Sequence, residues 1–294
     1  MSGFTRRMFL GSAGRYNIPT EFAIWGSSSA QGYGGGGVSV GSELQARFGI
    51  PMYNGGVGGQ WSTHVAARQG GRPALLSLSG GSIPASGTIA ATTPTMHILS
   101  FSAAGSLQGV SGTLASSGDL TTYQFTRSAS GSVTSVPNDT PFIPTQGSQR
   151  RADGTIIWSG KNDITSGTGN MAICAESVDA TVAYLLPRTQ YLVMGHFANS
   201  TMPVGTSART RMDAENARLA SIYGDRYVDV YAYLKSAQVW VDSGVTPNAT
   251  DLSDQADGVI PISLRSDTGH LNGAGYAAVA VLVGDTIVAQ GWLG

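Results

Sequence analysis

The chain has 294 residues, of which 12% are charged, and its formal net charge at pH 7 is −1. A chain of this length can bury a large core, either as one elaborated domain or as two. Its balanced charge supplies no basic surface for nucleic acid or for an anionic membrane, so we expect neither as a partner.

The first residues and the single cysteine bear on where the protein works. Residues 5–11 resemble a twin-arginine export motif, but polar residues follow where an apolar stretch is required, so we expect no signal peptide. No apolar run reaches membrane-spanning length, which predicts a soluble chain without a membrane span. An extracellular or virion-associated location stays open. Cys174 cannot form an internal disulfide, and its apolar helical surroundings predict a buried thiol.

The amino-terminal part alternates between strand-like and helix-like segments. The pattern predicts strands over 22–26 and 50–54, and helices over 38–48 and 62–68, the second helix with Ser62 as its cap. Strands that alternate with helices in this way are typical of a parallel sheet.

A segment of different texture follows. Over 71–151 charges nearly vanish, and Ser, Thr and Gly separate short alternating runs such as 95–101 and 122–126. These features predict a small antiparallel β domain, a barrel or a sandwich, inserted into a host domain formed by 1–70 and 152–294. Such an insert could also join copies of the chain, so a homo-oligomer is one possible assembly.

The alternation resumes after the insert. The predicted strands are 155–160, 190–197 and 227–234, and the predicted helices are 170–186, 208–223 and 273–291, with a mostly irregular stretch over 239–266. This order specifies an α/β fold, in which a parallel sheet is covered by helices on both faces. Functional loops are then expected at the carboxyl ends of the strands.

Four short motifs fall in such loops. They are Gly26-Ser27-Ser28 with Gly32, the run from Asn54 to Gly59, Gly160-Lys161-Asn162-Asp163, and Asp267-Thr268-Gly269-His270. A serine between glycines at the end of a buried strand is typical of a nucleophile on a tight turn. A serine hydroxyl attacks well only when a neighbouring base takes its proton, and an imidazole titrates in the right range for that task. Four motifs in order are far more specific than any one of them.

In these four motifs the chain resembles the SGNH, or GDSL-like, hydrolases, and the resemblance spans the host domain. It implies a flavodoxin-like three-layer sandwich with a parallel central sheet. It also implies a catalytic triad, with Ser28 as nucleophile, His270 as general base and Asp267 as the residue that orients the imidazole. The implied oxyanion hole comprises the backbone N–H groups of Ser28 and Gly59 and the side-chain amide of Asn162.

The first motif departs from the family pattern at one position. Ser27 stands where the family has an aspartate, so a carboxylate that would brace this turn is missing. Because three serines are adjacent, the register rests on Gly26 and Gly32, which select Ser28 and leave Ser29 as the alternative nucleophile.

Other residues near the predicted strand ends carry weaker signals. Gln60 and Trp61 follow the second motif, and we expect them to contact substrate, although Trp61 could equally pack beneath the loop. For His64 and His196 we predict local hydrogen bonds, and for Asp163 a structural role in its own turn. No group of histidines and carboxylates has metal-ligand spacing, so neither a metal nor another cofactor is expected.

The resemblance implies a serine esterase that cleaves carboxylic esters through an acyl-enzyme. We expect a small ester or an acylated carbohydrate as substrate, in particular O-acetyl groups. Many relatives deacetylate carbohydrate, and the insert would overhang the cleft. A short-chain lipolytic esterase or thioesterase is the alternative of the same class. The alternative of another class is an inactive binding or structural module of a surface or virion assembly, which the serine at position 27 favours.

Overall fold

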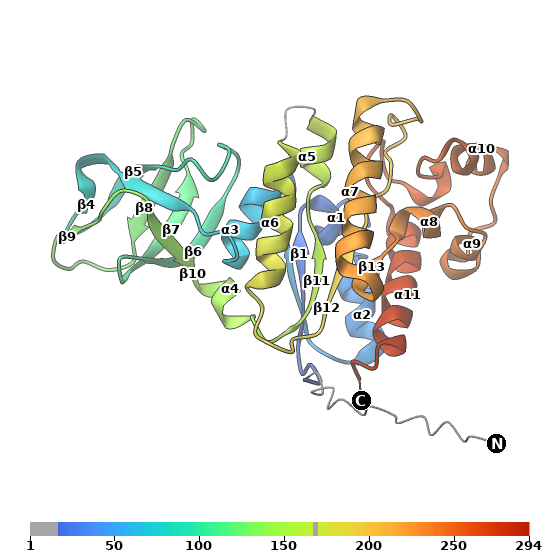
Figure 1. The fold of residues 1–294 in the computed structure, drawn as a ribbon, viewed down its shortest axis with the longest axis horizontal. Coiled ribbons are helices and arrows are strands. Elements are labelled where there is room, and N and C mark those ends of the chain that lie inside the picture. The colour runs from blue at the N-terminus through green and yellow to red at the C-terminus, as the bar shows by residue number, and fades with distance from the viewer. Residues whose placement is uncertain (1–16, 167–169, 294) are drawn as a thin grey trace, which may run out of the picture.

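The computed structural model describes residues 17–166 and 170–293 of the chain. The twin-arginine motif lies outside the described residues. Two units stand side by side, an α/β unit and a smaller β-barrel unit (Figure 1). This arrangement confirms the predicted α/β fold and the predicted antiparallel β insert, whereas the exact domain boundaries at 70 and 152 remain a prediction.

The α/β unit is built on a five-stranded parallel sheet. In spatial order its strands are β2 (Met52–Gly56), β1 (Phe22–Gly26), β11 (Gly154–Trp158), β12 (Tyr191–Met194) and β13 (Tyr227–Val228). From β1 the chain adds β2 on one side, and later adds β11 to β13 on the other side. The carboxyl ends of β1 and β11 therefore flank the point where the strand order reverses, which is where ligands bind in open α/β sheets.

Helices cover both faces of this sheet (Figure 1). The helices of the α/β unit are α1 (Ser28–Gln31), α2 (Val40–Phe48), α3 (Ser62–Gln69), α5 (Lys161–Ser166), α6 (Met171–Ala183), α7 (Ser207–Tyr223), α8 (Val230–Leu234), α9 (Gln238–Ser243), α10 (Ala249–Asp257) and α11 (Gly273–Ala289). Helices α2 and α11 pack on one face, and α3, α6 and α7 pack on the other.

The side chains of β1 explain this layering. Phe22 and Ile24 point to the face covered by α2 and α11, whereas Ala23 and Trp25 point to the face covered by α3. All four side chains are buried, because alternate residues of a central strand face opposite layers. The first strand of the sheet thus shares its core with the last helix of the chain.

The β-barrel unit is closed and antiparallel. Its strands in order around the barrel are β10 (Thr140–Pro144), β3 (Leu75–Leu78), β5 (Thr88–Thr92), β8 (Tyr123–Arg127), β7 (Val110–Ser116) and β6 (Ser102–Leu107). The short strands β4 (Ser82–Ile83) and β9 (Thr134–Ser135) pair with each other, and α4 (Thr145–Gln149) leads back to the sheet. Leu76, Leu114, Phe125 and Phe142 fill the barrel core.

Several segments differ from the prediction. Residues 95–101 form no strand, because Met96 and Phe101 turn into the core from an irregular loop. The predicted strand over 227–234 is wrong beyond Val228: the Asp229 side chain accepts the N–H of Ala232 and starts helix α8. The stretch over 239–266, predicted as mostly irregular, contains most of helix α9 and the whole of helix α10.

The start of helix α3 also differs. Trp61 occupies the N-cap position, and Ser62 is the first helical residue. The Ser62 hydroxyl donates to Asp163 at 2.8 Å, so it joins α3 to α5 and does not cap its own helix.

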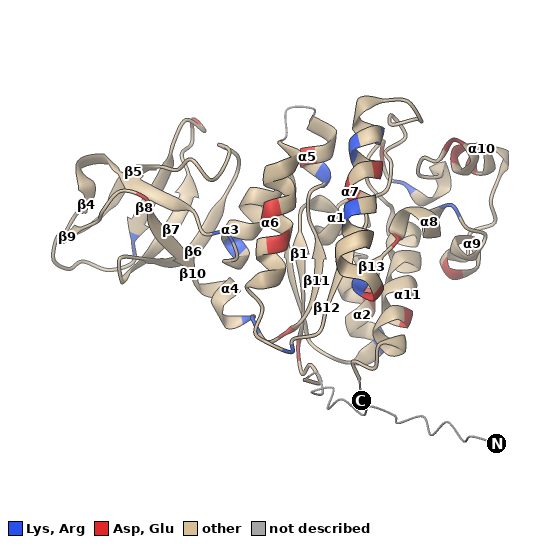
Figure 2. Ribbon diagram, viewed as in Figure 1, with Lys and Arg blue, Asp and Glu red and all other residues tan. Residues whose placement is uncertain are grey.

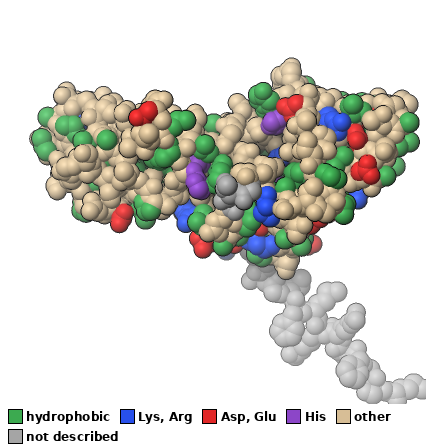
Figure 3. Space-filling view, turned by 90° about the horizontal axis from the view of Figure 1, so that it is seen from above, with side chains coloured by type: hydrophobic (Ala, Val, Ile, Leu, Met, Phe, Trp, Pro, Cys, Tyr) green, Lys and Arg blue, Asp and Glu red, His purple; other side chains and the backbone are tan. Residues whose placement is uncertain are grey.

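Charged side chains lie mostly on the α/β unit, and the barrel carries few (Figure 2). On the face seen from above they are scattered and do not gather into one patch (Figure 3). Among the described residues, no helix combines the length and the apolar character that spanning a bilayer requires.

The close approach of β2 to helix α1 requires a glycine. A Cβ on Gly56 would lie 2.1 Å from the backbone nitrogen of Gln31, and backbone atoms cannot move away cheaply. We therefore expect Gly56→Ala to lower the free energy of unfolding by about 1–3 kcal/mol in urea denaturation. Gly118→Ala is the control, because no atom lies within 4 Å of its added Cβ. Equal stability of the two variants would contradict the packing argument.

Candidate active site

Ser28 lies at the carboxyl end of β1, as the first residue of helix α1. Its Oγ is 2.9 Å from Nε2 of His270, a residue 242 positions later in the chain. The strand ends at Gly26, where a Cβ would lie 2.1 Å from the carbonyl oxygen of Trp158. Ser29 is 1% exposed, and its hydroxyl has no hydrogen-bond partner among the described residues. The structure therefore brings Ser28, and not Ser29, to the imidazole.

The loop before α11 holds the imidazole against a carboxylate. Nδ1 of His270 lies 2.9 and 3.0 Å from the two carboxylate oxygens of Asp267. Oδ1 of Asp267 also accepts the backbone N–H groups of Gly269 and His270, at 2.7 and 2.8 Å. Burial alone would raise the pKa of Asp267, but these hydrogen bonds and the imidazole hold it below its usual value. An ionised carboxylate keeps the proton on Nδ1, so Nε2 can accept the hydroxyl proton of Ser28.

A cleft of about 330 Å³ opens above this pair and is lined by Ser28, Tyr33, Gly58, Gly59, Asn162, Asp267 and His270. Gly59 has a φ of +76°, which glycine adopts without strain, and no atom lies within 4 Å of the position that a Cβ would take. Nδ2 of Asn162 donates to the carbonyl oxygen of Gln60 at 2.9 Å. An amide carries two N–H donors, so the second remains available to a ligand.

Of the two residues that follow Gly59, only one stays near the surface. Gln60 is 1% exposed, because its side chain accepts from Arg68 and donates to the carbonyl of Ser100. The prediction that Gln60 contacts substrate is corrected accordingly, since this side chain joins helix α3 to the loop before β6. Trp61 is half-buried, and its ring lies 4.0 Å from the ring of His97, between centroids.

Three residues near the site were missed by sequence reasoning. Tyr33 is 56% exposed, and its ring centroid lies 4.7 Å from that of His270. Arg68 is buried and donates to the carbonyl of Gly55, in the segment that leads to Gly59, at 2.7 Å. Lys161 is buried beneath the loop that carries His270. For Lys161 the sequence held one signal: it is one of only two lysines in the chain, and it stands within the third motif.

The two other histidines of interest are buried and neutral. Nε2 of His64 lies 2.6 Å from the carbonyl oxygen of His97, which confirms a hydrogen bond, and burial lowers the pKa of His64 to about 4. Burial lowers the pKa of His196 to about 3. A backbone hydrogen bond at Ser159 opposes that shift, in keeping with the predicted local hydrogen bond, and the Asn216 side chain bonds to both the backbone N–H and the carbonyl of His196.

Asp163 and Cys174 have structural positions. Asp163 accepts both the backbone N–H and the hydroxyl of Ser62, so it ties α5 to α3. Burial raises the pKa of Asp163 above its usual value, and the bonds from Ser62 oppose that rise. Cys174 is buried, as predicted, and burial raises the pKa of its thiol.

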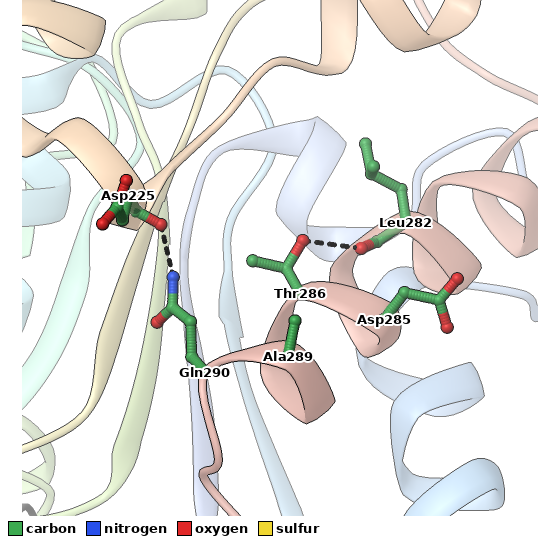
Figure 4. Close-up of a pocket in the computed structure, with 6 residues that line it drawn as sticks. All are labelled: Asp225, Leu282, Asp285, Thr286, Ala289 and Gln290. Atoms are coloured by element: carbon green, nitrogen blue, oxygen red, sulfur yellow. Dashed lines mark hydrogen bonds between the residues drawn. The ribbon is translucent and has the colours of Figure 1, made fainter.

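A second hollow, of about 510 Å³, lies near the end of helix α11 (Figure 4). It is lined by Asp225, Leu282, Asp285, Thr286, Ala289 and Gln290. Its side chains are engaged locally: Gln290 donates to the backbone of Asp225, and Asp285 pairs with Arg47. It holds no nucleophile beside a base. In the described part of the chain, no group of three or more His, Cys, Asp or Glu residues could hold a metal ion.

No protein family model matches the chain. It is 29% identical over 258 residues to the tail spike protein of Salmonella phage epsilon15, in an alignment that covers 78% of this chain and 23% of that protein. The chain thus spans less than a quarter of the length of this curated relative.

Three solved structures are similar at low sequence identity. A protein named for the G-D-S-L lipolytic family, from Desulfitobacterium hafniense, is 10% identical with a TM-score of 0.48, covering 91% of this chain and 99% of that one. A protein named as an acylhydrolase, from Bacteroides fragilis, is 12% identical with a TM-score of 0.47, covering 92% and 88%. The lipase Lip_vut3 from a goat rumen metagenome is 9% identical with a TM-score of 0.48, covering 92% and 97%. At TM-scores below 0.5 we draw no conclusion from these likenesses.

Proposed function

We propose that this chain is a serine esterase of the SGNH type, with a flavodoxin-like host domain. The observation that carries the proposal is the contact of 2.9 Å between Ser28 Oγ and His270 Nε2, with Asp267 on the other ring nitrogen. A hydroxyl, an imidazole and a carboxylate in this sequence form the arrangement that activates a serine for acyl transfer. The pair lies in an open cleft beside candidate oxyanion donors.

The reaction follows in two balanced steps. Oγ of Ser28 attacks the ester carbonyl carbon while His270 takes its proton, and the N–H groups of Ser28, Gly59 and Asn162 stabilise the oxyanion. The tetrahedral intermediate expels the alcohol, which takes the proton from the imidazolium and leaves an acyl-enzyme. Water then attacks the acyl carbon with His270 as base, which releases the carboxylic acid and restores Ser28. Asp267 holds the imidazole in the required tautomer throughout.

The direct test combines covalent labelling with hydrolysis. We expect a fluorophosphonate probe to add to the purified chain on the peptide that contains Ser28, as located by mass spectrometry. We also expect hydrolysis within a series of p-nitrophenyl esters from acetyl to octanoyl. A chain that is neither labelled nor active on any ester or thioester would overturn the proposal and favour the inactive structural module. A maximum at longer acyl chains would favour the lipolytic alternative.

We further propose an acylated carbohydrate as the substrate. The support is another pocket, here called the junction pocket, which lies between the two units and has a volume of about 310 Å³. Its lining comes from α3 and the turn after it, from α6, and from the loop between β5 and β6. The lining residues are Thr63, Arg72, Thr93, Pro94, Thr95, Met96, His97 and Ile173. Hydroxyls, a guanidinium and an imidazole among a few apolar side chains suit the mixed surface of a sugar ring.

The junction pocket is linked to the catalytic cleft through Trp61. This residue follows Gly59 by two positions, and its ring packs on His97, which lines the pocket. The hydroxyl of Thr63 is buried in the pocket wall and has no hydrogen-bond partner in the described ranges. Nη1 of Arg72 donates to the Ser177 hydroxyl at 3.1 Å, and Nη2 lies 3.5 Å from the Glu176 carboxylate. A guanidinium carries five N–H donors, so others remain for a ligand. A polymer with its ester at Ser28 could therefore place a neighbouring sugar here.

This substrate proposal predicts a selective loss in Arg72→Gln. Removing a charged hydrogen-bond donor costs about 1.5 kcal/mol or more, so we expect kcat/KM on an acetylated polysaccharide to fall about 10-fold, chiefly through KM. Activity on p-nitrophenyl acetate should stay within about twofold, because that ester does not reach the pocket. Arg188→Gln is the matched control, since Arg188 is exposed in the loop before the amino end of β12, whereas Ser28 follows the carboxyl end of β1. Parallel losses on both substrates would exclude the junction pocket as a sugar site.

The partial likeness to a phage tail spike supports a virion-associated location, which we propose alongside the esterase activity. The substrate would then be an acylated glycan on a cell surface. Mass spectrometry of purified particles tests this location, and absence of the chain from them would contradict it. The assembly of copies through the barrel remains a prediction, which light scattering of the purified protein tests.

A further inference from the structure

We propose that Lys161 is a positioning residue, whose buried ammonium holds the loop of Asp267 and His270 in its reactive geometry; this inference rests on the proposed esterase function. Lys161 is the second residue of the Gly160–Asp163 motif and the first residue of helix α5. Its Nζ donates to the carbonyl oxygen of Gly269 at 2.6 Å. That carbonyl belongs to the residue directly before His270, so the bond acts on the peptide that carries the imidazole.

The ammonium also packs against an aromatic ring. Nζ lies 3.2 Å from the centroid of the Phe197 ring, so the cation sits on an aromatic face. Phe197 is itself fixed, because it is 1% exposed and packs edge-to-face on Trp158, the last residue of β11. The ammonium thus connects the loop before α11 to residues at the carboxyl ends of the sheet strands.

Two clamps hold consecutive carbonyls of this loop. The backbone N–H of Ser200 donates to the carbonyl of Thr268 at 2.8 Å, and Lys161 donates to the carbonyl of Gly269. Asp267 occupies the inner side of the same turn, where it accepts two backbone N–H groups. Of these contacts, only the one from Lys161 comes from a motif that also supplies a candidate oxyanion donor, Asn162. Helix α5 therefore sets the distance between the base and the oxyanion site.

Burying an ammonium is costly, which argues for a role beyond stability. Lys161 is 7% exposed, and an apolar residue of similar length would avoid the desolvation cost. The titratable groups that face the ammonium are the Asp267 carboxylate and the neutral imidazole of His196. Burial lowers the pKa of Lys161 well below its usual range, and the charge of Asp267 opposes that shift.

The main experiment compares Lys161→Met with wild type. We expect kcat on p-nitrophenyl acetate to fall at least 10-fold with KM within about twofold, because a displaced imidazole slows attack without weakening binding. The melting temperature should stay unchanged or rise, since methionine carries no buried charge. Lys235→Met is the matched control: it removes the other lysine, which lies over Tyr231 in α8, and its kcat should equal that of wild type.

The pH profile gives a readout that a merely structural role would not move. Because the lysine pKa is lowered, the ammonium is present at low pH and is lost as pH rises through a value below the usual lysine range. We expect the wild-type kcat to fall on that alkaline side, whereas Lys161→Met should be flat there, at its lower plateau. If Lys161→Met does not fold, Lys161→Gln keeps an N–H donor without the charge and should show the same flat profile.

Hydrogen exchange separates this inference from the esterase proposal. The amides of Gly269 and His270, which donate to Asp267, should exchange faster in Lys161→Met than in wild type or Lys235→Met. This measurement needs no substrate, so it tests the clamp even if no ester is cleaved. Unchanged exchange together with a kcat within twofold of wild type would overturn the role of Lys161.

Discussion

Ser28→Ala is expected to lower kcat for ester hydrolysis by about 10⁴- to 10⁶-fold, because removing the nucleophile of a serine triad leaves only binding and oxyanion stabilisation. The hydroxyl lies 2.9 Å from His270 Nε2 in an open cleft, so its removal should leave the fold intact. The measurement is the steady-state rate on p-nitrophenyl acetate, with circular dichroism to verify folding.

Ser29→Ala is the matched control for this variant. It removes the hydroxyl of the neighbouring residue, which is buried and has no hydrogen-bond partner among the described residues. We expect its kcat to stay within a few-fold of wild type. If Ser29→Ala lost the activity and Ser28→Ala kept it, the nucleophile would be assigned to the wrong serine. Equal rates for wild type and both variants would remove the enzyme proposal.

Asn162→Ala is expected to lower kcat by about 10²- to 10³-fold, which corresponds to about 3–4 kcal/mol of transition-state stabilisation. KM should change little, because the amide meets charge that develops only in the tetrahedral intermediate. The side chain also donates to the carbonyl of Gln60, so a small loss of stability, about 1 kcal/mol, is expected in urea denaturation.

The control for the oxyanion assignment lies on the same helix. Thr165→Ala changes a residue one turn further along α5, whose hydroxyl bonds back to the carbonyl of Asn162. Its kcat should remain near that of wild type. A loss in Asn162→Ala that appears entirely in KM would show that the amide binds the ground state, and it would contradict the oxyanion role.

The sheet could be predicted because its strands are continuous apolar runs. Phe22 to Trp25 and Ile156 to Trp158 are buried on both faces, and such segments read plainly as central strands. The barrel was recognisable from short alternating runs with few charges. The segment after Val228 was not, because its apolar residues suit a strand as well as a short helix. The hydrogen bond that the Ala232 N–H donates to the Asp229 carboxylate caps the helix that forms there.

The candidate site divides in the same way. Ser28, Asp267 and His270 stand in recognisable motifs, and the structure brings them together. Gln60 was assigned to substrate from its position alone, yet Arg68 and Ser100 draw its amide inward. These two partners come from a helix and from the barrel, so no local pattern could reveal them. Long-range partners of this kind are what a single sequence leaves undetermined.

The pairing of the first strand with the last helix has a consequence for synthesis in the cell. The ribosome releases Ser28 before His270, and α11 completes the layer that α2 begins on one face of β1. A nascent chain therefore carries the proposed nucleophile without its proposed base until translation has passed His270.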